Sequence, residues 1–555
     1  MISDMDENKF GDMHENKFGD MHINKNQDAD ESINNKVIDK HYNKKENMQD
    51  STQGNKQDNI YSNKQDSKQD NIYSNEQDKK QDNTQGNNMM SAGTLNRIIY
   101  ALVAVCILFF SLVAYLTYFE LFQKNKIINN SYNRRQFEME EKTLRGSILD
   151  RNGTVLAESE FSDEKQVRKY PYGAMYSHVI GYSSRRYGKS LIESRFNDYL
   201  LGVNDSSTVF NLRDKLAGGT KEGNNIYLTI DHQLQALANE LMKDKKGAVV
   251  ALDPKTGEIL AMISKPDFDP NEQKLEENWN SMVESKEAPF LPRATQGLYT
   301  PGSTFKVLTV ASALENGMEN NTYKDKGSIV IDGKEISNYG GKAYGEINLK
   351  TALAVSSNTV FASIGVELGG ENLRGISERA GIGEKIPFDI SVSKSVFQYK
   401  EMSKTDMAAV GMGQGKILMT PLHMALVSSA IANDGIMMKP SLVSRIETQK
   451  GTVLKKHKTD ELYRVMDQDT AAKINEMMQE VVNNGTGKNA SIKGIKVAGK
   501  TGTAENELTS GQKNKEHAWF IGFAPADDPK IAVAVILEYS GSTGGSAAAP
   551  IAREL

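Results

Sequence analysis

Residues 298–306 read Leu-Tyr-Thr-Pro-Gly-Ser-Thr-Phe-Lys, and no other stretch of the chain says as much about its fold and chemistry. Gly302 permits a tight turn, and the apolar pattern from Phe305 onward predicts that a helix begins here. Ser303 and Lys306 are three residues apart, so on a helix they share one face. A serine hydroxyl is a poor nucleophile at neutral pH unless a base lies within hydrogen-bonding reach. Lysine can be that base when burial or a neighbouring cation lowers its pKa.

The Ser-x-x-Lys spacing alone is weak evidence, because about two such matches are expected by chance in a chain of this length. Other matches do occur, for example at Ser162/Lys165 and at Ser391/Lys394. Lys-Thr-Gly also occurs twice, and residues 255–257 are better interpreted as the turn of a hairpin. Specificity therefore has to come from the order and separation of several segments.

Two later segments supply that order. Residues 356–358 read Ser-Ser-Asn and begin 53 residues after Ser303. Residues 500–502 read Lys-Thr-Gly and begin 142 residues after Asn358. Each of the three motifs is common by itself, whereas all three in this order are rare.

The second Lys-Thr-Gly lies near the end of an apolar run and predicts an extended strand. Side chains alternate along a strand, so Lys500 and Gly502 would face one way, and Thr501 and Thr503 the other. Local twist or a bulge then decides which of these side chains reach a cleft.

Along residues 226–539, which contain the three motifs, the pattern predicts strands first, then helices, then strands again. The expected strands cover 226–230, 248–254, 258–263, 518–524 and 531–539, and the expected helices start at 231 and cover 305–316, 421–433 and 471–483. This order predicts an α/β (α+β) domain with a central antiparallel sheet flanked by helices.

Residues 98–119 form an apolar stretch with no charged residue inside it. Twenty-two residues at about 1.5 Å each give about 33 Å, enough to cross a hydrocarbon core of about 30 Å. The stretch starts too late and is too long for a cleaved signal peptide, and it is apolar all round, so it predicts a transmembrane helix. The flanking positive charges nearly balance and do not orient it.

The residues before this stretch are of low complexity. Residues 7–14 recur unchanged directly afterwards at 15–22, and residues 56–63 recur at 68–75. The composition is rich in Asn, Gln, Asp and Lys, with too few apolar residues to offset the entropy of ordering. We predict a disordered tail over residues 1–92, and a tethered interaction arm is the alternative.

The overall composition excludes several classes of protein. The 555 residues allow about three or four domains. The net charge of −5, from 67 basic and 72 acidic residues, gives no reason to expect binding to nucleic acid. A single cysteine, Cys106, excludes an intramolecular disulfide and a cysteine-based zinc site.

Ser-x-x-Lys, Ser-x-Asn and Lys-Thr-Gly in this order resemble the motifs of the penicillin-binding protein and serine β-lactamase superfamily. Further stretches are similar to transpeptidases, at 298–306, 413–415 with 420–421, 498–505 and 519–525. Upstream, residues 145–153 and 178–182 resemble the stalk of class B penicillin-binding proteins. The resemblance runs from about residue 125 to the C-terminus and implies a stalk over 124–225 and a transpeptidase domain over 226–555.

The resemblance also implies a set of site residues. Those with catalytic roles are Ser303, Lys306, Ser356 and Lys500, and those that bind substrate are Asn358, Thr501, Gly502 and Thr503. Ser303 would attack the penultimate D-Ala carbonyl of a stem peptide, and Lys306 would take its proton. The backbone N–H groups of Ser303 and Thr503 would form the oxyanion hole. We expect no metal and no cofactor.

The function implied is that of a peptidoglycan D,D-transpeptidase, which cross-links stem peptides ending in D-Ala-D-Ala and is the target of β-lactams. The catalytic domain would lie outside the cytoplasmic membrane and the tail inside. About a hundred residues between the span and the catalytic domain are too few for a polymerase domain, so a separate membrane glycosyltransferase is the expected partner. Two alternatives share the motifs: a serine β-lactamase and a membrane-anchored β-lactam sensor.

Overall fold

The computed structural model describes residues 92–119, 143–162, 165–203, 221–504 and 516–555. A single long helix, α2 (Ala92–Tyr118), opens the described part. Its segment Asn96–Tyr118 is the one described helix that is long and apolar enough to cross a membrane. The prediction of one long apolar helix is confirmed, although the helix begins before the predicted residue 98. Nearly all of the tail predicted over residues 1–92 lies outside the described residues.

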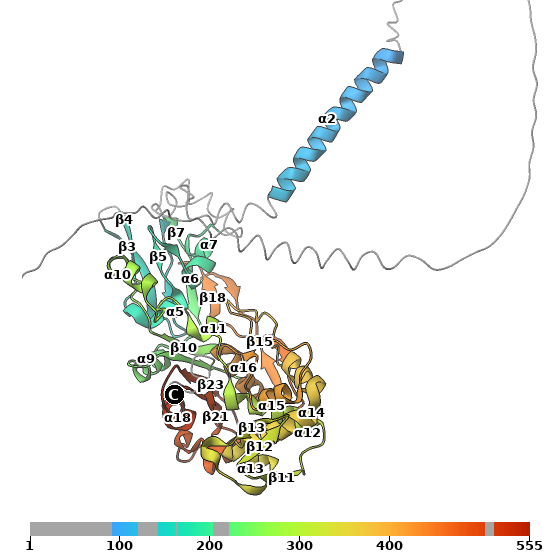
Figure 1. Cartoon of the computed structure of the whole chain (residues 1–555). Helices are drawn as coiled ribbons and strands as arrows, with labels where there is room; N and C mark the ends of the chain where they lie inside the picture. Colours follow the sequence, from blue (N-terminus) through green and yellow to red (C-terminus); the bar gives the residue numbers. More distant parts are fainter. Residues whose placement is uncertain (1–91, 120–142, 163–164, 204–220, 505–515) are drawn as a thin grey trace, which may run out of the picture. The chain divides into compact units, whose positions relative to one another are not determined.

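A five-stranded antiparallel sheet forms the centre of the C-terminal part (Figure 1). Its strands, in spatial order, are β10 (Ile259–Lys265), β9 (Gly247–Leu252), β23 (Ile531–Leu537), β22 (His517–Ala524) and β21 (Ala498–Ala504). The predicted hairpin is β9–β10, and the two predicted late strands are β22 and β23. The expected central antiparallel sheet is therefore confirmed.

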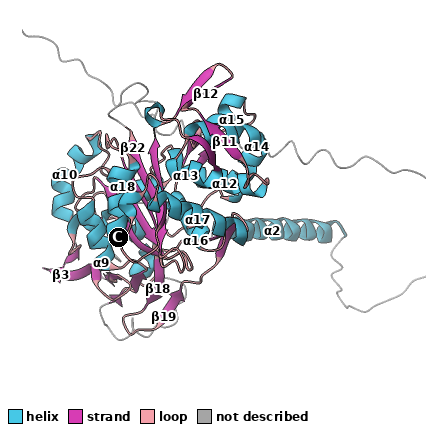
Figure 2. Cartoon of the chain, turned by 90° about the horizontal axis from the view of Figure 1, so that it is seen from below, coloured by secondary structure: helices cyan, strands magenta, loops and turns pink. Residues whose placement is uncertain are grey.

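Both faces of this sheet are covered by helices (Figure 2). Helices α9 (His232–Leu241) and α18 (Gly544–Glu554) cover one face, where Val249 and Ala251 point. Helices α12 (Lys306–Glu315), α14 (Asn358–Arg379) and α16 (Pro421–Ala432) belong to the core on the other face, with Ala248 and Val250. A strand buried on both faces must be apolar throughout, which is why β9 reads as a continuous apolar run rather than an alternating one.

The remaining elements of the C-terminal part are shorter. The helices are α10 (Glu272–Glu284), α11 (Arg293–Gln296), η4 (Gly302–Phe305), η5 (Tyr339–Gly341), α13 (Leu349–Val355), α15 (Lys404–Gly411), α17 (Gln468–Asn483) and η6 (Lys488–Ala490). Paired short strands are β11 (Thr322–Asp325) with β14 (Gly345–Asn348), β12 (Ser328–Ile331) with β13 (Lys334–Ser337), β15 (Val396–Phe397) with β16 (Ile417–Leu418), and β17 (Ile436–Met438) with β20 (Glu461–Arg464). The predicted helices at 421–433 and 471–483 correspond to α16 and α17.

The upstream part, from residue 143, contains short strands and helices. They are β1 (Thr143–Leu144), β2 (Ile148–Leu149), β3 (Val155–Ser162), β4 (Lys165–Lys169), η2 (Gly173–Tyr176), α5 (Ser177–Ile180), β5 (Ser183–Ser184), β6 (Gly188–Lys189), α6 (Leu191–Arg195), α7 (Asn197–Leu200) and β7 (Lys221–Glu222). A six-stranded sheet has the order β19 (Val453–Lys456), β18 (Val443–Glu447), β8 (Asn225–Leu228), β2, β3 and β4. This sheet continues across the predicted boundary at 225–226, and the domain bounds stay a prediction.

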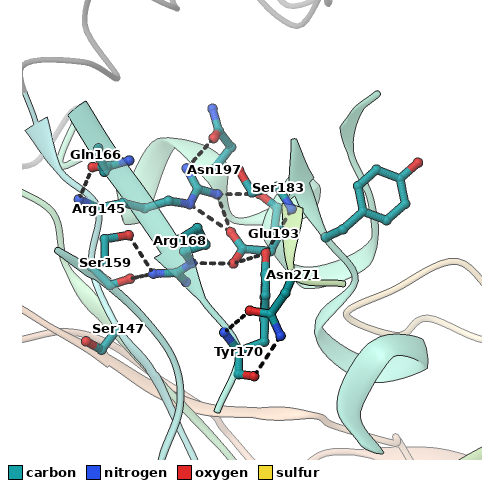
Figure 3. Close-up of polar contacts among 12 residues, drawn as sticks. Arg145, Ser147, Ser159, Gln166, Arg168, Tyr170, Ser183, Glu193, Asn197 and Asn271 are labelled. Carbon is teal, nitrogen blue, oxygen red and sulfur yellow. Dashed lines mark hydrogen bonds and ion pairs between the residues drawn. The ribbon is translucent and has the colours of Figure 1, made fainter. Parts of the chain in front are cut away.

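A buried ion-pair network holds the upstream part together (Figure 3). Glu193 lies between two arginines: its Oε2 accepts from Arg145 Nε at 2.7 Å, and its Oε1 accepts from Arg168 Nε at 2.8 Å. Arg145 Nη1 also donates to Asn197 Oδ1, and Tyr170 OH donates to Glu193 Oε1. Burial by itself would raise the pKa of Glu193, but the charges of the two arginines hold that pKa at about 2. The carboxylate is therefore ionised and paired inside the fold.

Candidate active site

Ser303 lies in the short 3₁₀ turn η4, directly before α12. The helix predicted from Phe305 thus begins at Lys306, and the serine stands on the turn that leads into it. In a 3₁₀ turn residues i and i+3 eclipse, so Ser303 and Lys306 still share a face. Gly302 has φ = +55°, and a Cβ there would stand 2.9 Å from Thr503 O. The glycine is needed both for this backbone conformation and for the close approach of β21.

The segment before the turn is anchored to the central sheet. Trp519 Nε1 on β22 donates to Thr300 O at 3.1 Å. Tyr299 OH donates to Glu538 Oε1 at 2.6 Å, and the same carboxylate accepts from Arg293 Nε at 2.8 Å. These contacts hold the side chain of Tyr299 and the carbonyl of Thr300, and so they fix the backbone that leads into the Ser303 turn.

Lys306 is fully buried, and its amine points at the Ser-Ser-Asn segment. Nζ lies 2.9 Å from Ser356 O, 3.3 Å from Ser357 O and 2.9 Å from Asn358 Oδ1. It also lies 3.4 Å from Ser356 Oγ. The structure thus brings the first two motifs together around one lysine nitrogen.

Ser356 ends α13 in the left-handed conformation, with φ = +59°. This conformation is uncommon for a residue other than glycine, and it is found mostly at turns and functional sites. Its hydroxyl accepts from Lys500 Nζ at 2.9 Å, so it lies between the amines of Lys306 and Lys500. The third motif is therefore joined to the other two through a single serine hydroxyl.

Strand β21 pairs with β22 from Ala498 to Ala504 without a shift of register. No bulge interrupts the alternation, so Lys500 points at Ser356 while the Thr501 hydroxyl meets Thr486 Oγ1 at 2.6 Å. Gly502 is closely packed, because a Cβ there would lie 3.0 Å from Thr304 Cγ2 and from Trp519 Cβ. Thr503 is half-buried beside the serine turn.

Both lysines are perturbed in the direction that a lysine base requires. Burial, and then the positive charge of Lys500, lower the pKa of Lys306 well below its usual value. Burial lowers the pKa of Lys500 to about 7. A neutral Lys306 can accept a proton at neutral pH, whereas an ordinary lysine cannot.

Not every residue of the predicted set is linked by a hydrogen bond. Lys306, Ser356, Asn358 and Lys500 are connected as described above. The half-buried Ser303 Oγ makes no hydrogen bond among the described residues. Such contacts often tighten only when substrate binds, so this geometry does not count against Ser303 as the nucleophile.

Several residues that support the site stand outside the sequence motifs. Thr486 faces Thr501, Glu538 holds Tyr299, and Asp325 and Asn338 contact the Ser-Ser-Asn segment. Each is a single polar residue outside any motif, and Asn338 precedes a glycine turn that resembles many others. Only their positions in the folded chain show that they contact the site.

Comparisons with known proteins identify the family to which the chain belongs. Residues 247–555 match the family "Penicillin binding protein transpeptidase domain", and residues 145–226 match "Penicillin binding protein A dimerisation domain". The chain is 32% identical over 477 residues to the peptidoglycan D,D-transpeptidase PbpA of Mycolicibacterium smegmatis, covering 81% of this chain and 96% of the relative. It is 30% identical to MrdA of Acinetobacter baumannii, covering 70% of this chain and 65% of the relative.

A solved structure is also similar. The penicillin G acyl-enzyme complex of penicillin-binding protein A from Mycobacterium tuberculosis gives a TM-score of 0.70 at 32% identity, covering 74% of this chain and 98% of that one. The fold and site thus define a serine-type acyl transferase of the penicillin-binding class. The chain belongs to the class B penicillin-binding proteins and is a peptidoglycan D,D-transpeptidase.

Proposed function

We propose that Ser303 is the nucleophile of this transpeptidase and that Lys306 is its base. Ser303 Oγ attacks the carbonyl carbon between the two D-alanines of a stem peptide, and Lys306 Nζ takes the hydroxyl proton. The C–N bond then breaks, the proton passes to the leaving nitrogen, and free D-Ala departs. An acceptor amine attacks the resulting ester, which forms the cross-link and restores the serine hydroxyl.

The observation that carries this proposal is the position of the Ser356 hydroxyl. It lies 2.9 Å from Lys500 Nζ and 3.4 Å from Lys306 Nζ, so it offers a path for the proton from the base toward the leaving nitrogen. Backbone N–H groups of Ser303 and Thr503 stabilise the oxyanion. The carbonyl of Thr503 already lies close to Gly302, which supports this pairing of turn and strand.

Substrate recognition follows from the same residues. The hydroxyls of Thr501 and Thr503 and the cation of Lys500 suit the terminal carboxylate of D-Ala-D-Ala, and Gly502 allows close approach. Asn358 Nδ2 donates one hydrogen to Ser337 O at 3.0 Å, which leaves its second hydrogen for a substrate carbonyl. A β-lactam presents the same reacting groups, an amide carbonyl and a carboxylate.

The test of this function is the fate of the acyl-enzyme. The purified full chain should release D-Ala from a D-Ala-D-Ala stem peptide when an acceptor amine is present. It should also hold a fluorescent penicillin as a long-lived adduct. Turnover of the penicillin many times per second would instead identify a β-lactamase, and acylation without any release of D-Ala would identify a sensor. Glycan polymer formed by this chain alone would contradict the proposed need for a separate membrane glycosyltransferase.

We also propose an orientation for α2, with the tail in the cytoplasm and the residues after the helix outside. Supporting this, the helix is long and apolar enough to anchor the chain, and the cross-linking reaction takes place outside the membrane. Protease added to intact protoplasts should remove residues 124–555 and spare the tail. Protection of the catalytic part, with loss of the tail, would reverse the orientation.

A further inference from the structure

The end of strand β13 contacts the Ser-Ser-Asn segment from the side away from the lysines. Asn338 Oδ1 accepts from Asn358 N at 2.7 Å and from Thr359 N at 3.1 Å. These are two of the N–H groups that a helix leaves without an intrahelical partner at its start, so Asn338 caps α14 from another element. The preceding carbonyl, Ser337 O, accepts from the Asn358 side chain. Two consecutive residues thus hold both the backbone and the side chain of Asn358.

Asp325, at the end of β11, orients the amide of Asn338. Asn338 Nδ2 donates to both carboxylate oxygens of Asp325 at 2.8 Å, and it donates to Lys342 O at 2.8 Å. An ionised carboxylate only accepts hydrogen bonds, so it fixes the amide with nitrogen toward Asp325 and oxygen toward α14. Asp325 also accepts from Ser357 Oγ at 2.7 Å. Both residues are buried, with Asp325 1% and Asn338 5% exposed.

This arrangement bears directly on the base. Asn358 Oδ1 and the carbonyls of Ser356 and Ser357 are three of the four acceptors around Lys306 Nζ. A neutral lysine has only two N–H groups and one lone pair, so the positions of its acceptors decide where that lone pair points. Ser356 is also held in a left-handed conformation that needs support from its surroundings.

We propose that Asn338, oriented by Asp325, is a positioning residue for acyl transfer, because it holds residues 356–358 in the geometry that aims Lys306 and Ser356. This inference rests on the proposed function of the Ser303 site. Neither residue touches the reacting atoms, and neither belongs to the three motifs. The short β11–β14 and β12–β13 pairs between α12 and α13 thus serve the chemistry and not only the packing.

The experiment measures the second-order rate of acylation of the full chain by a fluorescent penicillin, together with the thermal unfolding temperature. Asn338→Leu should lower the rate about 10²-fold, since a misplacement of about 1 Å in a catalytic group can cost that much. Asp325→Asn, which changes no volume, should also lower the rate, because two amide nitrogens would then face each other.

The matched control is Asp231→Leu. Asp231 caps α9 by accepting from two backbone N–H groups, Gln233 N and Leu234 N, as Asn338 does for α14, but it belongs to none of the site contacts. It should lower the unfolding temperature and leave the acylation rate of the folded protein unchanged.

The outcomes separate this inference from the function on which it rests. Failure to acylate the unchanged chain would overturn both. Acylation of the unchanged chain, with Asn338→Leu no slower than Asp231→Leu, would overturn the positioning role alone. If Asn338→Leu fails to fold, the isosteric Asp325→Asn decides, and an acylation rate of Asp325→Asn equal to that of the unchanged chain overturns the positioning role.

Discussion

Ser303→Ala should abolish labelling by a fluorescent penicillin while the protein stays folded. Without the hydroxyl there is no atom to form the ester, so the loss should reach at least about 10³-fold, as for the nucleophile of other serine acyl transferases. The change removes one oxygen from a half-buried side chain that makes no hydrogen bond among the described residues. The free energy of unfolding should therefore change by no more than about 0.5 kcal/mol. Gel fluorescence and a thermal melt measure the two quantities.

The chain supplies its own control for this experiment. Ser391 also stands three residues before a lysine, but both Ser391 and Lys394 are exposed and lie outside any helix or strand. This pair therefore lacks the burial that a lysine base requires. Ser391→Ala should therefore label like the unchanged protein. Labelling that survives Ser303→Ala, or is lost with Ser391→Ala, would show that the nucleophile has been misassigned.

The central sheet and its main helices could be predicted because their patterns are long. Strands β9, β22 and β23 are continuous apolar runs bounded by turns, α16 is a long, mostly apolar stretch that starts at a Thr-Pro pair, and α17 has a clear helical periodicity. The upstream sheet could not be predicted in the same way. Strand β2 has two residues, too few to show any period, and its parallel pairing with β8 brings together residues 148 and 226. Such pairing depends on tertiary packing rather than on local pattern.

For the site, too, the sequence could predict some residues and not others. The three motifs predict Ser303, Lys306, Ser356 and Lys500 as catalytic residues, and the structure connects the last three by hydrogen bonds. The order of the motifs could not reveal that the Ser356 hydroxyl would lie between the two lysines, because this depends on its left-handed backbone. Nor could it single out Asn338, since an asparagine before a glycine turn is most often only a turn residue.

Glu193→Ala should strongly destabilise the upstream part. Glu193 is fully buried and is the carboxylate that both Arg145 and Arg168 contact (Figure 3). Removing it leaves two buried guanidinium groups without their counter-ion, a situation that costs about 3–5 kcal/mol. Thermal unfolding of the full chain in detergent compares the variants.

The exposed pair Glu160–Lys169 on the neighbouring hairpin is the matched control, with side chains 50% and 47% exposed. Water already solvates these charges, so Glu160→Ala should cost no more than about 1 kcal/mol. The pH dependence adds a second criterion. The pKa of Glu193 is lowered to about 2, so its stabilisation is complete above the unfolded value of about 4.3 and is lost as the pH falls toward 2. The gap between the unchanged chain and Glu193→Ala should therefore narrow over that window. A gap that is independent of pH, or no larger than that for Glu160→Ala, would mean that the two arginines do not depend on this carboxylate.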